Sequence, residues 1–289
     1  MGQKMIGFIG LGDMGKPMAK NLLKAGFGVT TCGHVRKEPI EELRILGAIV
    51  VDSPKEVAEA SEVIIVIVRD TAQANEVIRG GKGFWEGKGI WQGIKRGSVL
   101  IVSSTVEPSY CQKLVVEGKE KGIDVLDVPV SGARTRAEDG TLSILAGGDE
   151  AVFERCRPIF EAMGRDIFYL GGPGMGQAFK LVNNYIGIVT AFTTSEGIAM
   201  GLKAGLDLTR MLEVIKVSSG NNSMVQRWDL TMAWRKEHDE NRENSVIGLQ
   251  YKDVGLAVKF AEELGVPATL GEHILQMDDS MLYPSEPPK

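Results

Sequence analysis

The first half of the chain alternates short apolar runs with stretches in which apolar residues recur at helical spacing. The apolar runs predict strands at Met5–Ile9, Gly28–Cys32, Ile49–Val51, Val63–Val68, Val99–Val102, Asp124–Asp127 and Leu142–Ala146. The amphipathic stretches predict helices at Met14–Lys24, Ile40–Leu46, Pro54–Ala60, Gln73–Ile78 and Pro108–Lys121. Because strands joined by crossover helices are typical of mostly parallel sheets, residues 1–170 are expected to form an α/β domain with a doubly wound sheet.

The pattern changes after residue 170, where the segment GGPGMG interrupts the chain. A long helix is predicted over Gln177–Ala204, and polar residues such as Lys180 and Glu196 interrupt it too often for a membrane span. Further helices are predicted at Thr209–Val217, Val225–Trp234, Gly248–Leu264 and Thr269–Asp279. Residues 171–289 are therefore expected to form an all-helical domain that begins with a long interdomain helix.

The segment Gly80–Gly97 is expected to be a loop, because glycines and two tryptophans dominate it. One interpretation is a surface excursion in which Trp85 and Trp91 cover local apolar surface. The alternative is a lid over a bound ligand.

Composition narrows the classes of protein that fit. Glycine accounts for 36 of 289 residues, about 12% against an average near 7%, which suits many tight turns and close approaches to a ligand. The formal net charge of −5 offers no basic surface to a nucleic acid. The three cysteines are spaced as neither a disulfide framework nor a metal pair, and the N-terminus has no signal or lipidation pattern. We expect a cytoplasmic protein without a metal site and without nucleic-acid or membrane partners.

The most specific local motif is GLGDMG, which follows an apolar strand directly and opens a helix. Its residues are Gly10, Leu11, Gly12, Asp13, Met14 and Gly15. This context is typical of the Rossmann dinucleotide-binding loop. Gly10 permits the turn, Gly12 lets the main chain approach a pyrophosphate, and Gly15 lets the helix pack on the strand, while the helix N-terminus offers N–H groups to the anion. A purely structural glycine turn is the alternative.

The end of the second strand bears on the choice of cofactor. An NAD enzyme places Asp or Glu there to accept the ribose 2′-hydroxyl, but this chain has His34, Arg36 and Lys37 beyond Cys32. Basic groups at this point favour the 2′-phosphate of NADP, so NADP(H) is favoured over NAD(H). The alternative is that Arg36 and Lys37 begin the next helix on its solvated side.

Two further patterns suggest chemistry. Lys180 and Asn184 are four residues apart, so they share one face of the long helix. Apolar neighbours there would lower the pKa of Lys180 and allow it to donate a proton near neutrality, unless its side chain extends to solvent. Ser131 follows an expected strand end, where ligands bind in open α/β sheets. Its hydroxyl and the N–H groups of Gly132 and Ala133 suit a carboxylate, although a plain turn also explains them.

Several distinct motifs are spread along essentially the whole chain in a fixed order. They are GFIGLGDMGKPMAKNL near the start, SSTVEP at 103–108, DVPVSGA and AEDGTL between 127 and 142, GMGQAFKLVNN at 174–184 and KDVGLA at 252–257. In these motifs the chain resembles the β-hydroxyacid dehydrogenase family, which includes 3-hydroxyisobutyrate dehydrogenase, tartronate semialdehyde reductase and glyoxylate/succinic semialdehyde reductases. The resemblance implies that Lys180 is the catalytic lysine and Asn184 the asparagine that orients the substrate.

The resemblance also implies the remaining contacts. Ser131 and Gly132, with the adjoining Ala133, would hold the substrate carboxylate. Cofactor contacts are implied for Thr105, Lys252 and the Val68-Arg69 pair, although relatives usually have Leu-Pro in place of that pair. Asp253 either approaches the substrate pocket or pairs with Lys252 or Lys259.

Other departures from the family pattern concern the substrate. Ala133 replaces the second glycine of the usual Ser-Gly-Gly, and Ser245 stands where many relatives have a pocket phenylalanine. Arg134 and Arg136 follow Ala133 where relatives are mostly uncharged. One hypothesis is that an arginine meets a second anionic group of the substrate, and the alternative is a pair of solvated loop arginines.

We therefore predict an NAD(P)-dependent oxidoreductase that interconverts a short 3-hydroxy acid and its semialdehyde at a site between the two domains. NADPH-dependent reduction is the expected direction, with Lys180 as proton donor. An imine reductase and a catalytically silent dinucleotide-binding module are the alternatives. The resemblance implies a homodimer or homotetramer formed through the helical domain, where Tyr185–Phe192 suits either internal burial or an interface.

Overall fold

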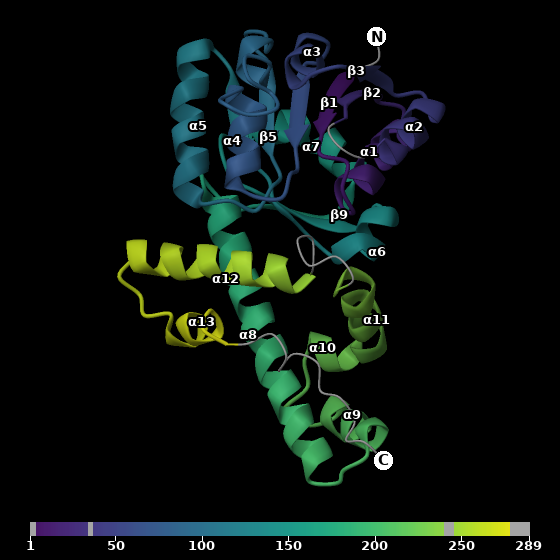
Figure 1. Ribbon diagram of the computed structural model, residues 1–289. Helices are drawn as coiled ribbons and strands as arrows, with labels where there is room; N and C mark the ends of the chain where they lie inside the picture. The colour runs from purple at the N-terminus through teal and green to yellow at the C-terminus, as the bar shows by residue number, and fades with distance from the viewer. Residues whose placement is uncertain (1–3, 34–36, 240–245, 278–289) are drawn as a thin grey trace. The chain divides into compact units, whose positions relative to one another are not determined.

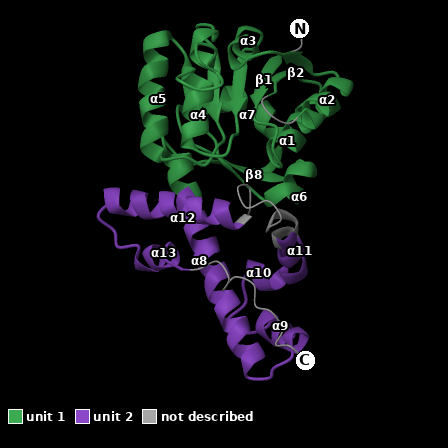
Figure 2. Ribbon diagram, viewed as in Figure 1, with its two compact units in different colours: residues 1–180 green, residues 181–289 purple. Residues whose placement is uncertain are grey.

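The computed structural model describes residues 4–33, 37–239 and 246–277. The chain divides into two compact units, residues 1–180 and 181–289 (Figure 2). This division falls later than the predicted boundary after residue 170, because the first turns of the long helix hydrogen-bond to loops of the sheet unit. Gln177 and Lys180 make those bonds.

A six-stranded parallel sheet organises the first unit (Figure 1). Its strands are β1 (Met5–Ile9), β2 (Gly28–Cys32), β3 (Ile49–Val51), β4 (Val63–Val66), β5 (Val99–Val102) and β6 (Asp124–Asp127). They lie in the order β3-β2-β1-β4-β5-β6, which is the doubly wound Rossmann order. The predicted fold class is confirmed. The order reverses between β1 and β4, so a ligand crevice is expected beyond the carboxyl ends of these two strands.

Helices cover both faces of this sheet, because alternate residues of each central strand are apolar on opposite sides. Ile6 and Phe8 of β1 belong to a core with α1 (Gly15–Lys24), α2 (Glu38–Ile45) and α7 (Glu150–Glu161). Ile64 and Val66 of β4 belong to a second core with α3 (Pro54–Glu59), α4 (Thr71–Arg79) and α5 (Pro108–Lys121). Burial on both faces fixes the strands, and through them the loops at their carboxyl ends.

A second sheet of three strands, in the order β7-β8-β9, was only partly predicted. It consists of β7 (Val130–Ser131), β8 (Leu142–Ala146) and β9 (Gly164–Tyr169). Sequence patterning found β8 but missed β7, β9, α6 (Ala133–Glu138) and α7. Two residues are too few for a visible period in β7, charged residues interrupt β9, and Pro158 lies inside α7.

One predicted strand end was also wrong. The fourth strand ends at Val66 and not at Val68, because the Val68 N–H bonds to the Ser104 side chain in place of a neighbouring strand. The sixth strand, β6, ends at Asp127 as predicted, and the chain then forms the short strand β7 before Ala133 begins α6.

The segment Gly80–Gly97 joins α4 to β5, so it lies at the amino ends of the parallel strands. It is a loop with one short 3-10 helix, η1 (Ile90–Gln92). Trp85 is buried and Trp91 partly buried against the core formed with α3, α4 and α5, and the Trp91 Nε1 donates to Glu117 of α5. The loop covers local apolar surface, and the lid interpretation is wrong because the loop lies at the opposite edge from the glycine loop.

Among the described residues of the second unit, all regular structure is helical. The helices are α8 (Met175–Lys203), which begins in the first unit, α9 (Leu208–Lys216), α10 (Ser223–Gln226), α11 (Trp228–Asp239), α12 (Val246–Glu263) and α13 (Thr269–Ile274). The single helix predicted over Val225–Trp234 is two helices, α10 and α11, and Asn222 caps the first by accepting bonds from the Met224 and Val225 N–H groups. Within the part of the chain that the structure describes, no helix combines the length and apolar character needed to cross a bilayer.

The helical unit has two apolar cores. Ile188 and Phe192 of α8 pack with α12 in one, and Ile198 and Leu202 pack with α9 in the other. The stretch Tyr185–Phe192 is thus partly internal, although Ile186 within it is 61% exposed.

Candidate functional site

The glycine loop after β1 has the backbone geometry that its sequence predicts. Gly10 has φ +102°, and a Cβ there would lie 1.9 Å from the Ile67 carbonyl oxygen beyond β4. A Cβ on Gly15 would lie 1.8 Å from the Gly10 oxygen, so both positions exclude a side chain. A Cβ on Gly12 would meet no atom within 4 Å. Gly12 is therefore not required by packing, and the open space beside it suits a ligand that approaches the main chain.

The N-terminus of α1 follows this loop without a side-chain cap at Met14. No acidic residue lies in its first turn, and Lys16 and Lys20 pair with Glu42 of α2 at 3.1 and 2.6 Å. An uncapped helix N-terminus with basic neighbours favours an anion. Leu11 packs against the core and anchors the loop, while the Asp13 side chain is exposed to solvent.

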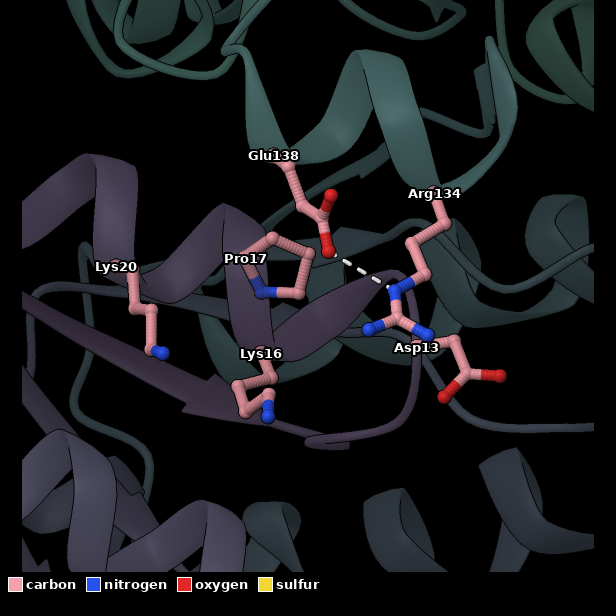
Figure 3. Close-up of a pocket in the computed structure, with 6 residues that line it drawn as sticks. All are labelled: Asp13, Lys16, Pro17, Lys20, Arg134 and Glu138. Carbon is pink, nitrogen blue, oxygen red and sulfur yellow. Dashed lines mark hydrogen bonds and ion pairs between the residues drawn. The ribbon is translucent and has the colours of Figure 1, made fainter.

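A polar pocket flanks this helix start (Figure 3). It is lined by Asp13, Lys16, Pro17, Lys20, Arg134 and Glu138. Figure 3 shows the Arg134 side chain reaching from α6 toward Asp13, and its Nε donates to Glu138 at 2.9 Å. Arg136 is held differently, by Asp166 of β9 at 2.5 Å and by the Ser143 hydroxyl at 3.2 Å. Arg136 is thus a cross-link between α6 and the second sheet and not a solvated loop arginine.

The end of β2 is only partly described. Cys32 is buried, and burial together with the Glu56 charge raises the pKa of its thiol to about 12. His34 and Arg36, predicted to contact the cofactor, lie outside the described residues, as does Ser245. Neither Cys32 nor Gly33 supplies an acid to a ribose 2′-hydroxyl.

The loops after β4 and β5 are tied together. The Val68 N–H donates to the Ser104 hydroxyl at 2.7 Å, and the Arg69 N–H donates to Gln73 at 3.2 Å. Arg69 is exposed and Thr105 partly buried. The structure therefore brings Val68 and the loop of Thr105 next to the crevice between β1 and β4, where a dinucleotide is expected.

The segment Ser131–Ala133 makes a sharp turn between β7 and α6. Gly132 has φ +139°, and Ala133 has φ +57°, a left-handed conformation at a position where the family usually has glycine. Ser131 is partly buried and pairs in the sheet with Ser143 of β8. The strained turn exposes Ala133 and leaves Ser131 and Gly132 partly exposed.

Lys180 lies at the end of the first unit on α8. It is partly buried, and its Nζ donates to the Val130 carbonyl oxygen at 2.8 Å. This bond places the ammonium group against the residue that precedes Ser131. The side chain is therefore directed at the predicted carboxylate-binding turn and does not simply extend into solvent.

Asp127 supports the same region from the end of β6. Its carboxylate accepts the N–H groups of Gly174 at 2.7 Å and Gln177 at 2.9 Å, which otherwise have no acceptor at the start of α8. Burial raises the pKa of Asp127 to about 6, and the hydrogen bonds from these N–H groups act in the opposite direction. The carboxylate thus fixes the start of the helix that carries Lys180.

In the second unit, three of the predicted residues are linked. The Asn184 Nδ2 donates to Asp253 Oδ2 at 2.7 Å, and Lys252 Nζ pairs with Asp253 Oδ1 at 2.7 Å. Asp253 pairs with Lys252, one of the two pairings predicted for it, and it also accepts a bond from Asn184. The carboxylate joins α8 to α12 and holds both side chains in place.

Sequence reasoning gave no role to Asp127 or Gln177. The sequence held one signal for each residue. Asp127 is an acid at the end of an apolar strand, and Gln177 lies three residues before Lys180, on the same face of the predicted helix. Among the described residues, no group of three or more His, Cys, Asp or Glu side chains is placed to hold a metal ion.

Comparison with known proteins agrees with this geometry. Residues 5–171 match a family model described as the NAD binding domain of 6-phosphogluconate dehydrogenase. Residues 174–284 match one described as NAD-binding of NADP-dependent 3-hydroxyisobutyrate dehydrogenase. The 2-hydroxy-3-oxopropionate reductase of Escherichia coli is 36% identical over 263 residues, which cover 90% of this chain and 85% of that protein.

Solved structures share the whole fold. A 3-hydroxyisobutyrate dehydrogenase from Salmonella typhimurium superposes with a TM-score of 0.81 at 26% identity and covers 97% of this chain and 99% of its own. An imine reductase from Myxococcus stipitatus reaches a TM-score of 0.66 at 18% identity, over 94% of this chain and 92% of its own, which shows the fold alone. The chain therefore belongs to the β-hydroxyacid dehydrogenase family of NAD(P)-dependent oxidoreductases.

Proposed function

We propose that this protein is an NADPH-dependent semialdehyde reductase that converts a short semialdehyde acid into the 3-hydroxy acid, with Lys180 as the proton donor. The observation that carries the proposal is the 2.8 Å bond from Lys180 Nζ to the Val130 carbonyl, which holds an ammonium group beside Ser131. A carboxylate anchor and a proton donor then lie together at the carboxyl ends of the strands.

The chain's own residues divide the work. The dinucleotide, when bound, supplies the hydride, and Gly10–Gly15 with the N-terminus of α1 would hold its pyrophosphate, since the space beside Gly12 is open. The Ser131 hydroxyl and the N–H groups of Gly132 and Ala133 bind the substrate carboxylate. Lys180 moves a proton from Nζ to the carbonyl oxygen as negative charge develops there.

Asn184 orients the substrate oxygen from the next turn of α8. One N–H of its Nδ2 donates to Asp253 at 2.7 Å, which leaves the second N–H for an acceptor such as the substrate oxygen, while its Oδ1 accepts from Asn183 Nδ2 at 3.3 Å. Asp253 thus fixes the rotamer of Asn184 and the position of Lys252, which we assign to the cofactor. Positioning of this kind supplies much of an enzyme's rate enhancement.

The preference for NADP(H) rests on the basic residues after β2 and on the absence of an acid at Cys32 and Gly33. The family model matched by residues 174–284 is described as NADP-dependent. Steady-state rates with NADPH and NADH on one semialdehyde decide the preference. A higher kcat/KM with NADH refutes it.

The assembly we propose is a cytoplasmic homodimer or homotetramer formed through the helical unit. Apolar side chains exposed on that unit support it, among them Ile186 at 61%, Met200 at 69% and Val217 at 88%. Light scattering of the purified protein measures the oligomeric state, and a monomer at micromolar concentration contradicts the proposal.

The substrate class is a C3 to C5 semialdehyde acid, and Arg134 is the candidate for a second anionic group. Its pair with Glu138 is about half exposed, so an incoming carboxylate competes with it at little cost. Arg134→Ala should lower kcat/KM for dicarboxylic semialdehydes by about tenfold, equivalent to one charged contact, and spare monocarboxylic ones. Equal losses for both classes remove Arg134 from the substrate site.

The decisive experiment replaces Lys180. Lys180→Met keeps the length of the side chain and removes the proton donor, so kcat should fall by about 100-fold or more while NADPH binding persists. Lys203→Met, an exposed lysine in the last turn of the same helix, is the matched control and should keep full activity. Undiminished turnover in a folded, NADPH-binding Lys180→Met enzyme refutes the proposed function.

A further inference from the structure

Gln177 is the most completely buried polar side chain near the proposed site. Its exposed fraction is 0%, and it lies in the first turns of α8, three residues before Lys180. A buried amide is costly unless its donor and its acceptor are both satisfied. The hydrogen bonds made by the Gln177 amide therefore show which parts of the chain this side chain connects.

Both ends of the Gln177 side chain bind the loop after β5. Its Nε2 donates to the Ser104 carbonyl oxygen at 2.8 Å, and its Oε1 accepts the Val106 N–H at 3.2 Å. The two bonds involve the residues on either side of Thr105. The main chain on both sides of Thr105 is therefore clamped to α8 by one side chain.

The main chain of Gln177 is held from another strand. Its N–H donates to the Asp127 carboxylate at 2.9 Å, and Lys180, on the same face of α8, donates to the Val130 carbonyl. The first two turns of α8 thus meet the loops after β5 and β6 and the start of β7. Gln177 thus lies on the same helix as the proton donor and also holds the Thr105 loop in place.

We propose that Gln177 is a positioning residue that sets the Thr105 loop, and with it the nicotinamide end of the cofactor, at a fixed distance from Lys180. The inference rests on the proposed function, since it takes Lys180 as proton donor and Thr105 as a cofactor contact. Gln177 touches neither reactant. It acts by keeping the hydride source and the proton source in register, and a displacement of about 1 Å between such groups can cost about 100-fold in rate.

The experiment compares three variants in the full-length protein. Gln177→Leu removes both hydrogen bonds and nearly keeps the volume. Gln177→Glu keeps the acceptor for Val106, and recovers the donor for Ser104 only when its carboxyl group is protonated. Gln112→Leu is the matched control, because Gln112 is exposed on α5 and its amide donates to the Pro173 carbonyl near the start of α8 and not to the Thr105 loop.

The expected result is a loss in kcat without a matching loss in binding. Gln177→Leu should lower kcat by about 10- to 100-fold, while KM and the NADPH dissociation constant change by less than about threefold. Gln112→Leu should keep wild-type kcat. A uniformly structural role would instead lower the folded, NADPH-binding fraction and leave kcat per bound site intact.

The pH profile gives a second readout that holds even if Gln177→Leu fails to fold. The ratio of kcat for Gln177→Glu to kcat for wild type should rise as pH falls, because protonation restores the donor to Ser104. The charged groups around this position are Asp127 at the end of β6, Glu107 after β5 and Lys180 on α8, and all are present in both proteins, so the ratio cancels their direct titration to first order. A ratio that is flat between pH 5 and 8 overturns the proposal.

The proposal and the function on which it depends fail separately. Loss of activity in Lys180→Met together with unchanged kcat in Gln177→Leu overturns the positioning role alone. The same loss in Lys180→Met together with a fall in kcat and an unchanged NADPH dissociation constant in Gln177→Leu supports both.

Discussion

Replacing Ala133 with glycine should make the protein more stable. Ala133 has φ +57°, the left-handed region in which a Cβ approaches the following carbonyl oxygen. That conformation costs an L-residue about 1–2 kcal/mol. Glycine adopts it freely, but it gives the unfolded chain extra conformational entropy worth about 0.4–1 kcal/mol. The difference leaves a net stabilisation of about 0.5–1 kcal/mol.

Urea unfolding followed by circular dichroism measures this change, which corresponds to a rise in Tm of about 1–4 °C for a unit of this size. Ala72→Gly is the matched control, because Ala72 is exposed in the right-handed turns of α4. It should destabilise by about 0.5–1 kcal/mol, the ordinary cost of glycine in a helix. Opposite signs for the two substitutions are expected.

If Ala133→Gly destabilises as much as Ala72→Gly, the strain at the turn is not real and the argument fails. Activity supplies a further check, since the substitution removes a methyl group beside the proposed carboxylate anchor. KM for the semialdehyde should change while the NADPH dissociation constant stays constant.

Three other predictions follow from the same structure. The pKa of Asp127 is raised from 3.8 to about 6, so its contribution to stability is largest below pH 4 and is lost as pH rises through 6. The difference in unfolding free energy between wild type and Asp127→Asn should therefore fall by about 3 kcal/mol over that range. A difference that does not change with pH contradicts the burial argument. Gly12→Ala should leave Tm unchanged, since its Cβ meets no atom within 4 Å, yet weaken NADPH binding at least about tenfold by fluorescence titration. Tight binding in that variant would place the pyrophosphate elsewhere. Glu117→Gln, which weakens the pairing to Arg79 at 2.6 Å at the amino ends of the strands, should lower stability by about 1 kcal/mol in urea and leave kcat as in wild type; a fall in kcat would return a catalytic role to the Gly80–Gly97 loop.

Much of the fold could be predicted because local patterns and tertiary packing agree. Five of the strands of the main sheet have the predicted bounds and the sixth starts where predicted, since buried parallel strands are nearly continuous apolar runs. The second sheet was mostly missed because β7 is held by its register with β8, and two residues carry no period of their own. The helix α6 was missed for a related reason: it begins at a residue with positive φ.

The candidate site divides in the same way. The glycine loop was predictable because Gly10 and Gly15 are each required by a close main-chain contact, which leaves a mark in the sequence. Lys180 and Asn184 were paired by helical spacing. Asp127 and Gln177 were not found, because an acid at a strand end and an amide in a helix have many uses.

The sequence by itself therefore determined the order of strands and helices that form the six-stranded sheet, the dinucleotide loop and the identity of the residues that can donate protons or bind anions. Only the tertiary structure decided that Arg136 is held by Asp166, that the Gly80–Gly97 loop is no lid, and that Gln177 clamps both sides of Thr105. The physical reason is the separation along the chain of the residues that interact. Periodicity and backbone conformation are local and leave their mark on neighbouring residues, whereas these contacts join residues far apart in the chain, and a side chain's partner is chosen by where the fold places it.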